Sequence, residues 1–117
     1  QILLIKRKNE PFKGKWALPG GFVDTDETLE EAVARELQEE TGLAGLYLKQ
    51  YRAFSDPNRD PRGRTVSVVF YALVEGNDDV KGNDDASEAQ WHNLNQLPKL
   101  AFDHQHILRK AIDDLNL

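Results

Sequence analysis

Three glutamates, Glu36, Glu39 and Glu40, lie close together in the segment ARELQEETGL (34–43). An α-helix turns the chain by about 100° per residue, so it would place all three carboxylates on one face. Like charges three and four residues apart repel each other and weaken a helix. A divalent cation would remove this repulsion, because Mg²⁺ and Mn²⁺ prefer oxygen ligands. The spacing therefore indicates either a metal site or an acidic helix face exposed to water.

The negative charge of the chain is concentrated around these glutamates. The net charge is −5, but residues 24–40 alone carry −7, so the rest of the chain is slightly basic. This segment contains one base, Arg35, whose guanidinium can pair with neighbouring carboxylates and orient them. Gly20 and Gly21 precede the segment, and a backbone without side chains can approach a metal ion or a phosphate closely. These neighbours favour the metal site.

The composition of the 117 residues is that of one globular domain. Hydrophobic residues make up 39% and charged residues 30%, and no apolar run is long enough to span a membrane. The acidic balance argues against general nucleic-acid binding. The chain has no cysteine, which excludes disulfides and thiolate chemistry and is typical of a reducing cytoplasm. It has no methionine, even at position 1, so we expect its natural N-terminus to be missing.

The elements that must position the glutamates can be predicted from the hydrophobic pattern. Apolar and alternating runs predict strands over residues 2–7, 46–54, 65–74 and 88–94. A helix is expected to begin near residues 27–28, after a cap at Thr25 or Asp26, and to end at Gly42. A second helix should follow Asp103, which can cap it. This order indicates an α/β fold with a mixed β-sheet covered by helices.

The spacing around the glutamates resembles the Nudix box at every fixed position. Gly21 is followed after five residues by Glu27, and after seven more by RELQEETGL (35–43). The flanking segments KWALPGG (15–21) and LPKLAFDH (97–104) are also similar to those of the family. The resemblance implies a single domain over residues 1–117, folded as an α/β/α sandwich in which the box forms a catalytic loop–helix–loop.

The resemblance also implies roles for the residues of the box. Glu36 and Glu40 would be the first ligands of a divalent metal, Mg²⁺ or Mn²⁺. Glu39 would be a third ligand or the catalytic base, and both roles remain open. The carbonyl of Gly20 is a candidate for an additional ligand.

The resemblance also implies roles other than metal binding, for Glu27, for Arg35 and for an acidic residue outside the box. Glu27 and Arg35 look like the structural ion pair of the family, which fixes the helix against the preceding loop. A base outside the box is common among relatives, and Glu88 is our first candidate for this role. Asp84 and Asp85, in the polar loop before it, are the alternatives.

Nudix enzymes hydrolyse a nucleoside diphosphate linked to another group, and the loop SDPNRDPRGR (55–64) points to one substrate. Relatives that cleave ADP-ribose carry a proline at a set distance beyond the box, where this chain has Pro57. The loop and the strand after it resemble the ADP-ribose pyrophosphatase branch. We therefore expect metal-dependent hydrolysis of ADP-ribose to AMP and ribose 5-phosphate.

Several side chains outside the box are candidates for contact with such a substrate. Planar guanidinium groups can bind phosphate or ribose, and the loop offers Arg59, Arg62 and Arg64. The alternative is that these arginines pair with Asp56 and Asp60 and hold the loop together. Phe102 is one of the aromatic residues that could stack on adenine. For His104 we expect a structural use, either shaping the pocket or capping the last helix.

Two other functions remain open on the sequence alone. The substrate could be another nucleoside diphosphate derivative or an oxidised nucleoside triphosphate. The domain could also sense ADP-ribose as part of a transcriptional regulator of NAD metabolism, joined to a winged-helix domain. The intact box and the lack of a basic DNA-reading helix favour the enzyme. We expect a cytoplasmic protein with a small nucleotide substrate and without nucleic-acid or membrane partners, while a homodimer is neither required nor excluded.

Overall fold

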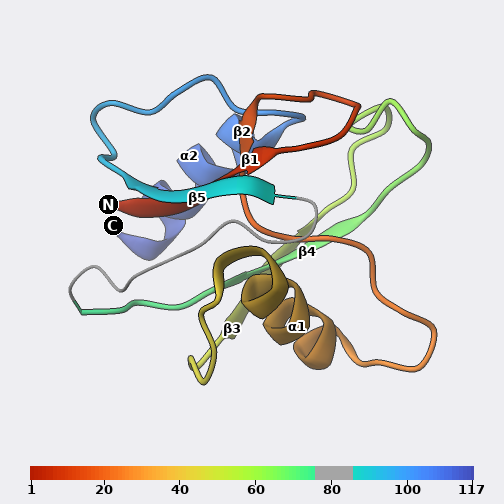
Figure 1. The fold of residues 1–117 in the computed structure, drawn as a ribbon, viewed down its shortest axis with the longest axis horizontal. Coiled ribbons are helices and arrows are strands. Elements are labelled where there is room, and N and C mark those ends of the chain that lie inside the picture. The colour runs from red at the N-terminus through yellow and green to blue at the C-terminus, as the bar shows by residue number, and fades with distance from the viewer. Residues whose placement is uncertain (76–85) are drawn as a thin grey trace.

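A computed structural model of the chain describes residues 1–75 and 86–117 (Figure 1). Its elements are, in order, β1 (Ile2–Arg7), β2 (Trp16–Ala17), α1 (Leu29–Thr41), β3 (Lys49–Phe54), β4 (Ser67–Tyr71), β5 (Ala86–His92) and α2 (His104–Leu115). The strand predicted over residues 2–7 is confirmed at both ends. The strands predicted over 46–54 and 65–74 are shorter than expected, and the last strand begins and ends earlier than 88–94.

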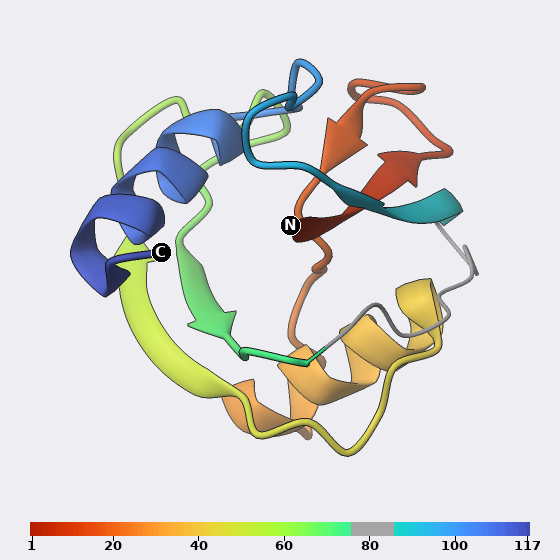
Figure 2. The ribbon, with the colours of Figure 1, turned by 90° about the vertical axis from the view of Figure 1, so that its left-hand side faces the viewer.

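The strands form two antiparallel sheets. In the first sheet β1 lies between β2 and β5, and Ile5 faces Ala17 on one side and Ala89 on the other. In the second sheet β3 pairs with β4. The parallel part of the expected mixed sheet is reduced, among the described residues, to an isolated bridge between Trp16 and Leu100. The two helices lie on different sides of β1 (Figures 1 and 2), which is the layered arrangement predicted.

Strand β1 is the centre of the hydrophobic core. Leu4 is fully buried and packs with Leu100 and with Leu108 of α2. Its neighbour Ile5 is 3% exposed and packs with Ala101 in a second cluster. Successive side chains of a strand point to opposite faces, so both faces of β1 are covered. This explains why its sequence is an uninterrupted apolar run without the polar alternation of a half-exposed strand.

Helix α1, which carries the glutamates, is capped at both ends by residues next to it in the sequence. The Thr28 side chain accepts a hydrogen bond from the Glu31 N–H, and the Glu31 carboxylate accepts one from the Thr28 N–H. This capping box makes Thr28 the cap, so the prediction of Thr25 or Asp26 was wrong. Gly42 ends the helix as predicted, with a φ of 81° that favours glycine.

Helix α2 follows Asp103 as predicted, but not because Asp103 caps it through its side chain. No capping hydrogen bond from that side chain is present, and its carboxylate pairs instead with Arg59, 44 residues earlier. The long-range ion pair thus replaces the local cap. Neither of the two helices in the described parts of the chain has the length and apolar character needed to cross a bilayer.

Candidate active site

Arg35 of α1 lies at the centre of a cluster of four carboxylates. Its Nη2 is 2.6 Å from Glu27 Oε1, and its Nη1 is 2.7 Å from Glu36 Oε1. Glu39 and Asp24 are more distant partners, at 3.3 Å and 3.7 Å. Hydrogen bonding to the guanidinium lowers the pKa of Glu27 to about 2, and the same contacts raise the pKa of Arg35. The ion pair expected between Glu27 and Arg35 is therefore formed, and the cluster as a whole remains strongly negative.

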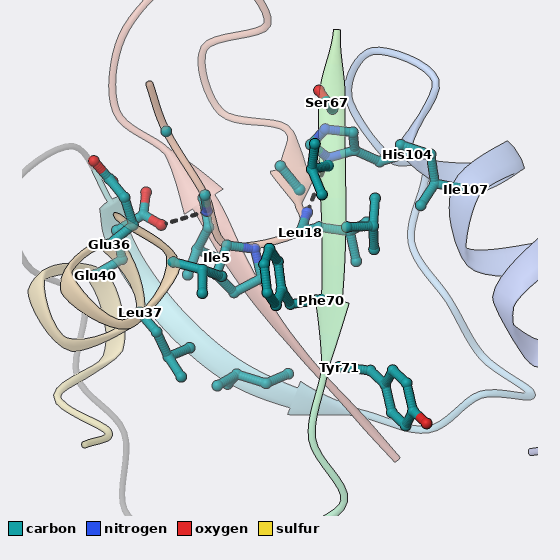
Figure 3. A pocket seen from close by; sticks show the side chains of 18 of the residues that line it. Ile5, Leu18, Glu36, Leu37, Glu40, Ser67, Phe70, Tyr71, His104 and Ile107 are labelled. Carbon is teal, nitrogen blue, oxygen red and sulfur yellow. Dashed lines mark hydrogen bonds between the residues drawn. The ribbon is translucent and has the colours of Figure 1, made fainter. Parts of the chain in front are cut away.

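Glu40 and Glu36 face the loop that contains the two glycines. Glu40 is 4% exposed, and its Oε1 accepts a hydrogen bond of 2.7 Å from the Gly20 N–H (Figure 3). A Cβ atom added to Gly21 would lie 2.5 Å from the carboxylate of Glu36. Only glycine at this position lets the loop approach Glu36 so closely. Glu39 differs from the other two glutamates, because its side chain is 40% exposed, although it contacts the same Arg35 Nη1 as Glu36.

Glu36 and Glu40 lie side by side at this loop (Figure 3), and their carboxylate oxygens are donors that suit a divalent cation. In the described part of the chain, no group of three or more acidic or histidine side chains is arranged as a metal site, and the choice between ligand and base for Glu39 stays a prediction. Mg²⁺ commonly takes one or two carboxylates and completes its shell with water and substrate phosphates. Two glutamates beside a bare backbone match that requirement.

Glu36 and Glu40 lie at one end of a cavity of about 920 Å³ between the two sheets (Figure 3). This volume lies in the range typical of sites for small organic ligands. At the other end, the cavity is lined by side chains from the loop before β4 and from the start of α2, among them Arg59, Arg62, Phe102 and His104. The structure thus brings the predicted metal ligands and part of the predicted substrate contacts to one cavity.

The side chain of Arg59 is buried and does not lie on the surface of the loop. Its side chain is 5% exposed, and its Nη2 and Nε donate to the two carboxylate oxygens of Asp103 at 2.8 Å and 2.9 Å. Its Nη1 donates to Ser67 Oγ of β4 at 2.7 Å. Arg59 therefore ties the loop to both α2 and β4, and its partner is neither of the two aspartates expected from the sequence.

Arg62 and Arg64 also have partners within the protein. Arg62 pairs with Asp60 at 2.8 Å, which is one of the contacts expected if the arginines hold the loop together. Arg64 donates to the backbone carbonyls of Ser55 and Asp56, so the Asp56 carboxylate is not its acceptor. Pro57 is exposed, and neither it nor Arg64 lines the cavity.

The ring of Phe102 contacts two arginines and a second aromatic ring. Its ring centre is 4.9 Å from the guanidinium carbon of Arg7 and 5.2 Å from that of Arg62. Arg62 is also 5.0 Å from the ring of Phe22, and Phe12 contacts the edge of Phe102. Such guanidinium–aromatic contacts stabilise the group and hold it in one arrangement. Phe22, Arg62 and Phe102 also line the cavity, so they form an aromatic and cationic part of its wall.

His104 has a contact that the sequence did not reveal. Its Nδ1 accepts a hydrogen bond of 3.0 Å from the N–H of Leu18, which is 86 residues away (Figure 3). Burial lowers the pKa of His104 to about 4, so its imidazole is neutral at physiological pH. The structural use expected for His104 agrees with this, although the partner is the loop before the glutamates. The only signal for it in the sequence was the segment LPKLAFDH.

Glu88 pairs with a lysine of the neighbouring strand β1. It lies on β5 opposite Lys6, at 3.7 Å from the lysine Nζ, and its side chain is 53% exposed. It does not line the cavity that contains Glu36 and Glu40. The alternatives Asp84 and Asp85 lie outside the described residues. Glu88 thus pairs with Lys6 and is not among the residues that line the cavity, and its role as the base stays a prediction.

Comparison with known proteins connects this site to a family. The family model described as NUDIX domain matches residues 1–115. An ADP-ribose pyrophosphatase of Methanocaldococcus jannaschii is 56% identical over 93% of this chain and 64% of that protein. An ADPR-responsive transcriptional repressor, NtrR, of Acinetobacter baylyi is 42% identical over 99% of this chain and 48% of the repressor. The chain thus spans about half to two thirds of the length of these relatives.

Solved structures give the same result for the fold. The NUDIX domain of Shewanella oneidensis NrtR, complexed with ADP ribose, superimposes with a TM-score of 0.89 at 36% identity, covering 97% of this chain and 76% of that one. A bifunctional NMN adenylyltransferase/ADP ribose pyrophosphatase from Francisella tularensis, complexed with AMP and a manganese ion, gives a TM-score of 0.85 at 32% identity. The match covers 97% of this chain and 37% of that protein.

Proposed function

The chain belongs to the Nudix family, and we propose that it is a metal-dependent hydrolase that cleaves ADP-ribose to AMP and ribose 5-phosphate. The observation that carries the proposal is the placement of Glu36 and Glu40 beside Gly20, at one end of a cavity of nucleotide size. The ADP-ribose pyrophosphatase among its relatives, at 56% identity, supports this choice of substrate.

The residues of α1 divide the work of the proposed reaction. Glu36, Glu40 and the Gly20 carbonyl would hold Mg²⁺ or Mn²⁺, which when bound neutralises the diphosphate and lowers the pKa of a water. Arg35 fixes the orientation of Glu36 through their 2.7 Å ion pair. Glu39 is half-exposed beside this group, and we assign it the role of accepting the proton of the attacking water.

The reaction consumes one water and needs no covalent intermediate. The water oxygen forms a bond to one phosphorus of the diphosphate while the bond from that phosphorus to the bridging oxygen breaks. The departing phosphate oxygen carries away the electron pair of that bond. The products are then two phosphate monoesters, AMP and ribose 5-phosphate. We favour Glu39 over Glu88 as the base, because Glu39 contacts the same Arg35 Nη1 as Glu36, whereas Glu88 pairs with Lys6 on the sheet.

The far end of the cavity would bind the rest of the nucleotide. A purine ring would stack on the wall formed by Phe22, Arg62 and Phe102, whose aromatic rings and guanidinium line the cavity. Arg59 serves this wall indirectly, since it fixes the loop that carries Arg62. Arg64 and Pro57 shape the same loop from outside the cavity.

The proposal is tested by measuring products from a panel of substrates. The protein is incubated with Mg²⁺ or Mn²⁺ and with ADP-ribose, NADH, ADP-glucose and nucleoside triphosphates, and AMP and pyrophosphate are quantified. We expect AMP and ribose 5-phosphate from ADP-ribose at the highest kcat/KM. Faster release of pyrophosphate from triphosphates would overturn the choice of substrate.

A second function is favoured by two of the comparisons. A repressor that responds to ADPR is 42% identical, and the NUDIX domain of a relative has been crystallised with ADP ribose. In that case this domain binds ADP-ribose as a signal. Tight binding of ADP-ribose, measured by calorimetric titration, without release of AMP would overturn the hydrolase and favour the sensor. A cytoplasmic location and a homodimer stay predictions.

A further inference from the structure

The loop before the glutamates is held at two points that come from distant parts of the chain. The N–H of Leu18 donates to His104 Nδ1 at 3.0 Å, and the N–H of Gly20 donates to Glu40 Oε1 at 2.7 Å. Between them lies Pro19, which has no N–H and a restricted φ. The segment Leu18–Gly20 is therefore a short, stiff connection from the first residue of α2 to the candidate metal ligand (Figure 3).

The hydrogen bond fixes the state of the imidazole ring. A nitrogen that accepts a hydrogen bond carries no proton, so the proton of the neutral ring is on Nε2. Position 104 is itself anchored, because its N–H donates to the carbonyl of Ala101 and the preceding Asp103 is bound by the buried Arg59. His104 thus presents an acceptor to Leu18 from a rigid support.

We propose that His104 is a positioning residue, whose Nδ1 sets the place of the segment Leu18–Gly20 and through it the Gly20 carbonyl and the Glu40 carboxylate. This use of the segment rests on the proposed function, although the hydrogen bond itself can be tested without it. Displacement of a reacting group by about 1 Å can lower the rate about a hundredfold. A residue that fixes this segment from a distance therefore affects turnover.

A purely space-filling role for His104 makes a different prediction. If the ring only fills space, phenylalanine should replace it with little effect on the site, whereas asparagine should leave a gap. If Nδ1 is the functional atom, the order is reversed. The Oδ1 of asparagine occupies nearly the position of Nδ1, while the amide of glutamine corresponds to Nε2 and does not reach the same place.

The experiment compares His104→Asn, His104→Gln and His104→Phe, with His106→Phe on the exposed side of the same helix as the control. Hydrogen exchange of the Leu18 amide is measured by NMR in the metal-free protein. Binding of Mn²⁺ and turnover of ADP-ribose are measured separately. In the Phe and Gln variants we expect the Leu18 amide to exchange at least about tenfold faster and Mn²⁺ to bind about tenfold more weakly. The Asn variant and the control should stay within about twofold of the wild type.

Two results would overturn the inference. One is wild-type protection of Leu18 and wild-type Mn²⁺ affinity in the Phe variant. The other is an equal loss in the Asn and Gln variants, which would indicate packing alone. If the Phe variant does not fold, the difference between the Asn and Gln variants in Leu18 exchange and Mn²⁺ affinity still tests the role of Nδ1. A wild-type protein that binds Mn²⁺ but hydrolyses none of the substrates would refute the proposed function, while the Leu18 and Mn²⁺ measurements would still decide the role of His104.

Discussion

The cluster on α1 and the loop 55–64 both combine arginines with carboxylates, but in opposite proportions. On α1, one guanidinium, that of Arg35, serves four carboxylates at 2.6–3.7 Å. In the loop, each arginine has its own acceptors: Asp103 for Arg59, Asp60 for Arg62 and two carbonyls for Arg64. The first group therefore keeps a negative excess, whereas the second is close to neutral.

This difference separates a binding group from a supporting group. A cluster with unbalanced charge gains free energy from a cation, because the ion relieves the repulsion between its carboxylates. A balanced group has little to gain from an external ion and contributes rigidity. We therefore expect substitutions on α1 to act mainly on metal binding and turnover, and substitutions of the buried loop arginine to act mainly on stability.

The strongest test of this contrast is Glu40→Gln, which keeps the shape of the side chain but removes its charge. Loss of a ligand should cost about 4 kcal/mol in the transition state, or roughly a thousandfold in kcat. The melting temperature should change little, because the amide oxygen can still accept from the Gly20 N–H. Glu30→Gln, at an exposed position in the first turn of the same helix, is the matched control. Full turnover by Glu40→Gln would refute the metal assignment.

The corresponding test of the loop is Arg59→Met. Removing one partner of a buried ion pair leaves the Asp103 carboxylate without its partner, and we expect a loss of about 3 kcal/mol in the free energy of unfolding. Urea denaturation measures this loss. Arg64→Met, which affects only exposed contacts to carbonyls, should change stability by less than about 0.5 kcal/mol. Equal losses in both variants would remove the distinction between a buried anchor and a surface contact.

A finer test uses the two glycines of the loop. Gly21→Ala places a methyl group 2.5 Å from the Glu36 carboxylate, which must move, while Gly20→Ala meets no atom within 4 Å. Because the end of a glutamate side chain moves easily, the fold should survive. We expect about a tenfold weaker Mn²⁺ affinity for Gly21→Ala, equal to about 1.4 kcal/mol, and a smaller effect for Gly20→Ala. Calorimetric titration with Mn²⁺ gives both values, and the reverse order would contradict the close approach to Glu36.

The smallest effect is expected for the pH dependence of stability. The pKa of Glu27 is lowered to about 2 in the folded protein, from an ordinary value of 4.5. Its contribution to stability is therefore complete above pH 4.5 and is lost as the pH falls from there towards about 2. In Arg35→Met and in Glu27→Gln, the melting temperature should decline less steeply across this interval. The change should be modest because water screens the pair, and an unchanged slope in both variants would contradict it.

The elements that sequence reasoning placed correctly are those with local causes. Strand β1 was recognised by its apolar run, and the end of α1 by Gly42. The start of α1 was misplaced, although Glu31 lies three residues after Thr28 and the capping-box rule selects that cap. Glu36, Glu40 and Gly20 were found as a group because their spacing is fixed by one helix and the loop before it.

The contacts that sequence reasoning missed depend on tertiary structure. Arg59 and Asp103 are 44 residues apart, and Leu18 and His104 are 86 apart, so no local pattern links them. Asp103 also shows how two requirements compete for one side chain. Local rules assign it to the helix N-terminus, but a buried guanidinium is the stronger partner and takes its carboxylate.

The pairing of β1 with β5 has a consequence for how the protein reaches its fold. Ile2 faces His92, so the central sheet joins segments that are far apart in the chain. Contacts of such long range slow folding, because the entropy of closing the loop is lost before the contacts form. During synthesis β1 emerges early and must wait for β5, and its apolar run is exposed in the meantime. The same strand that later forms the core is thus a segment that needs protection from aggregation until β5 has been made.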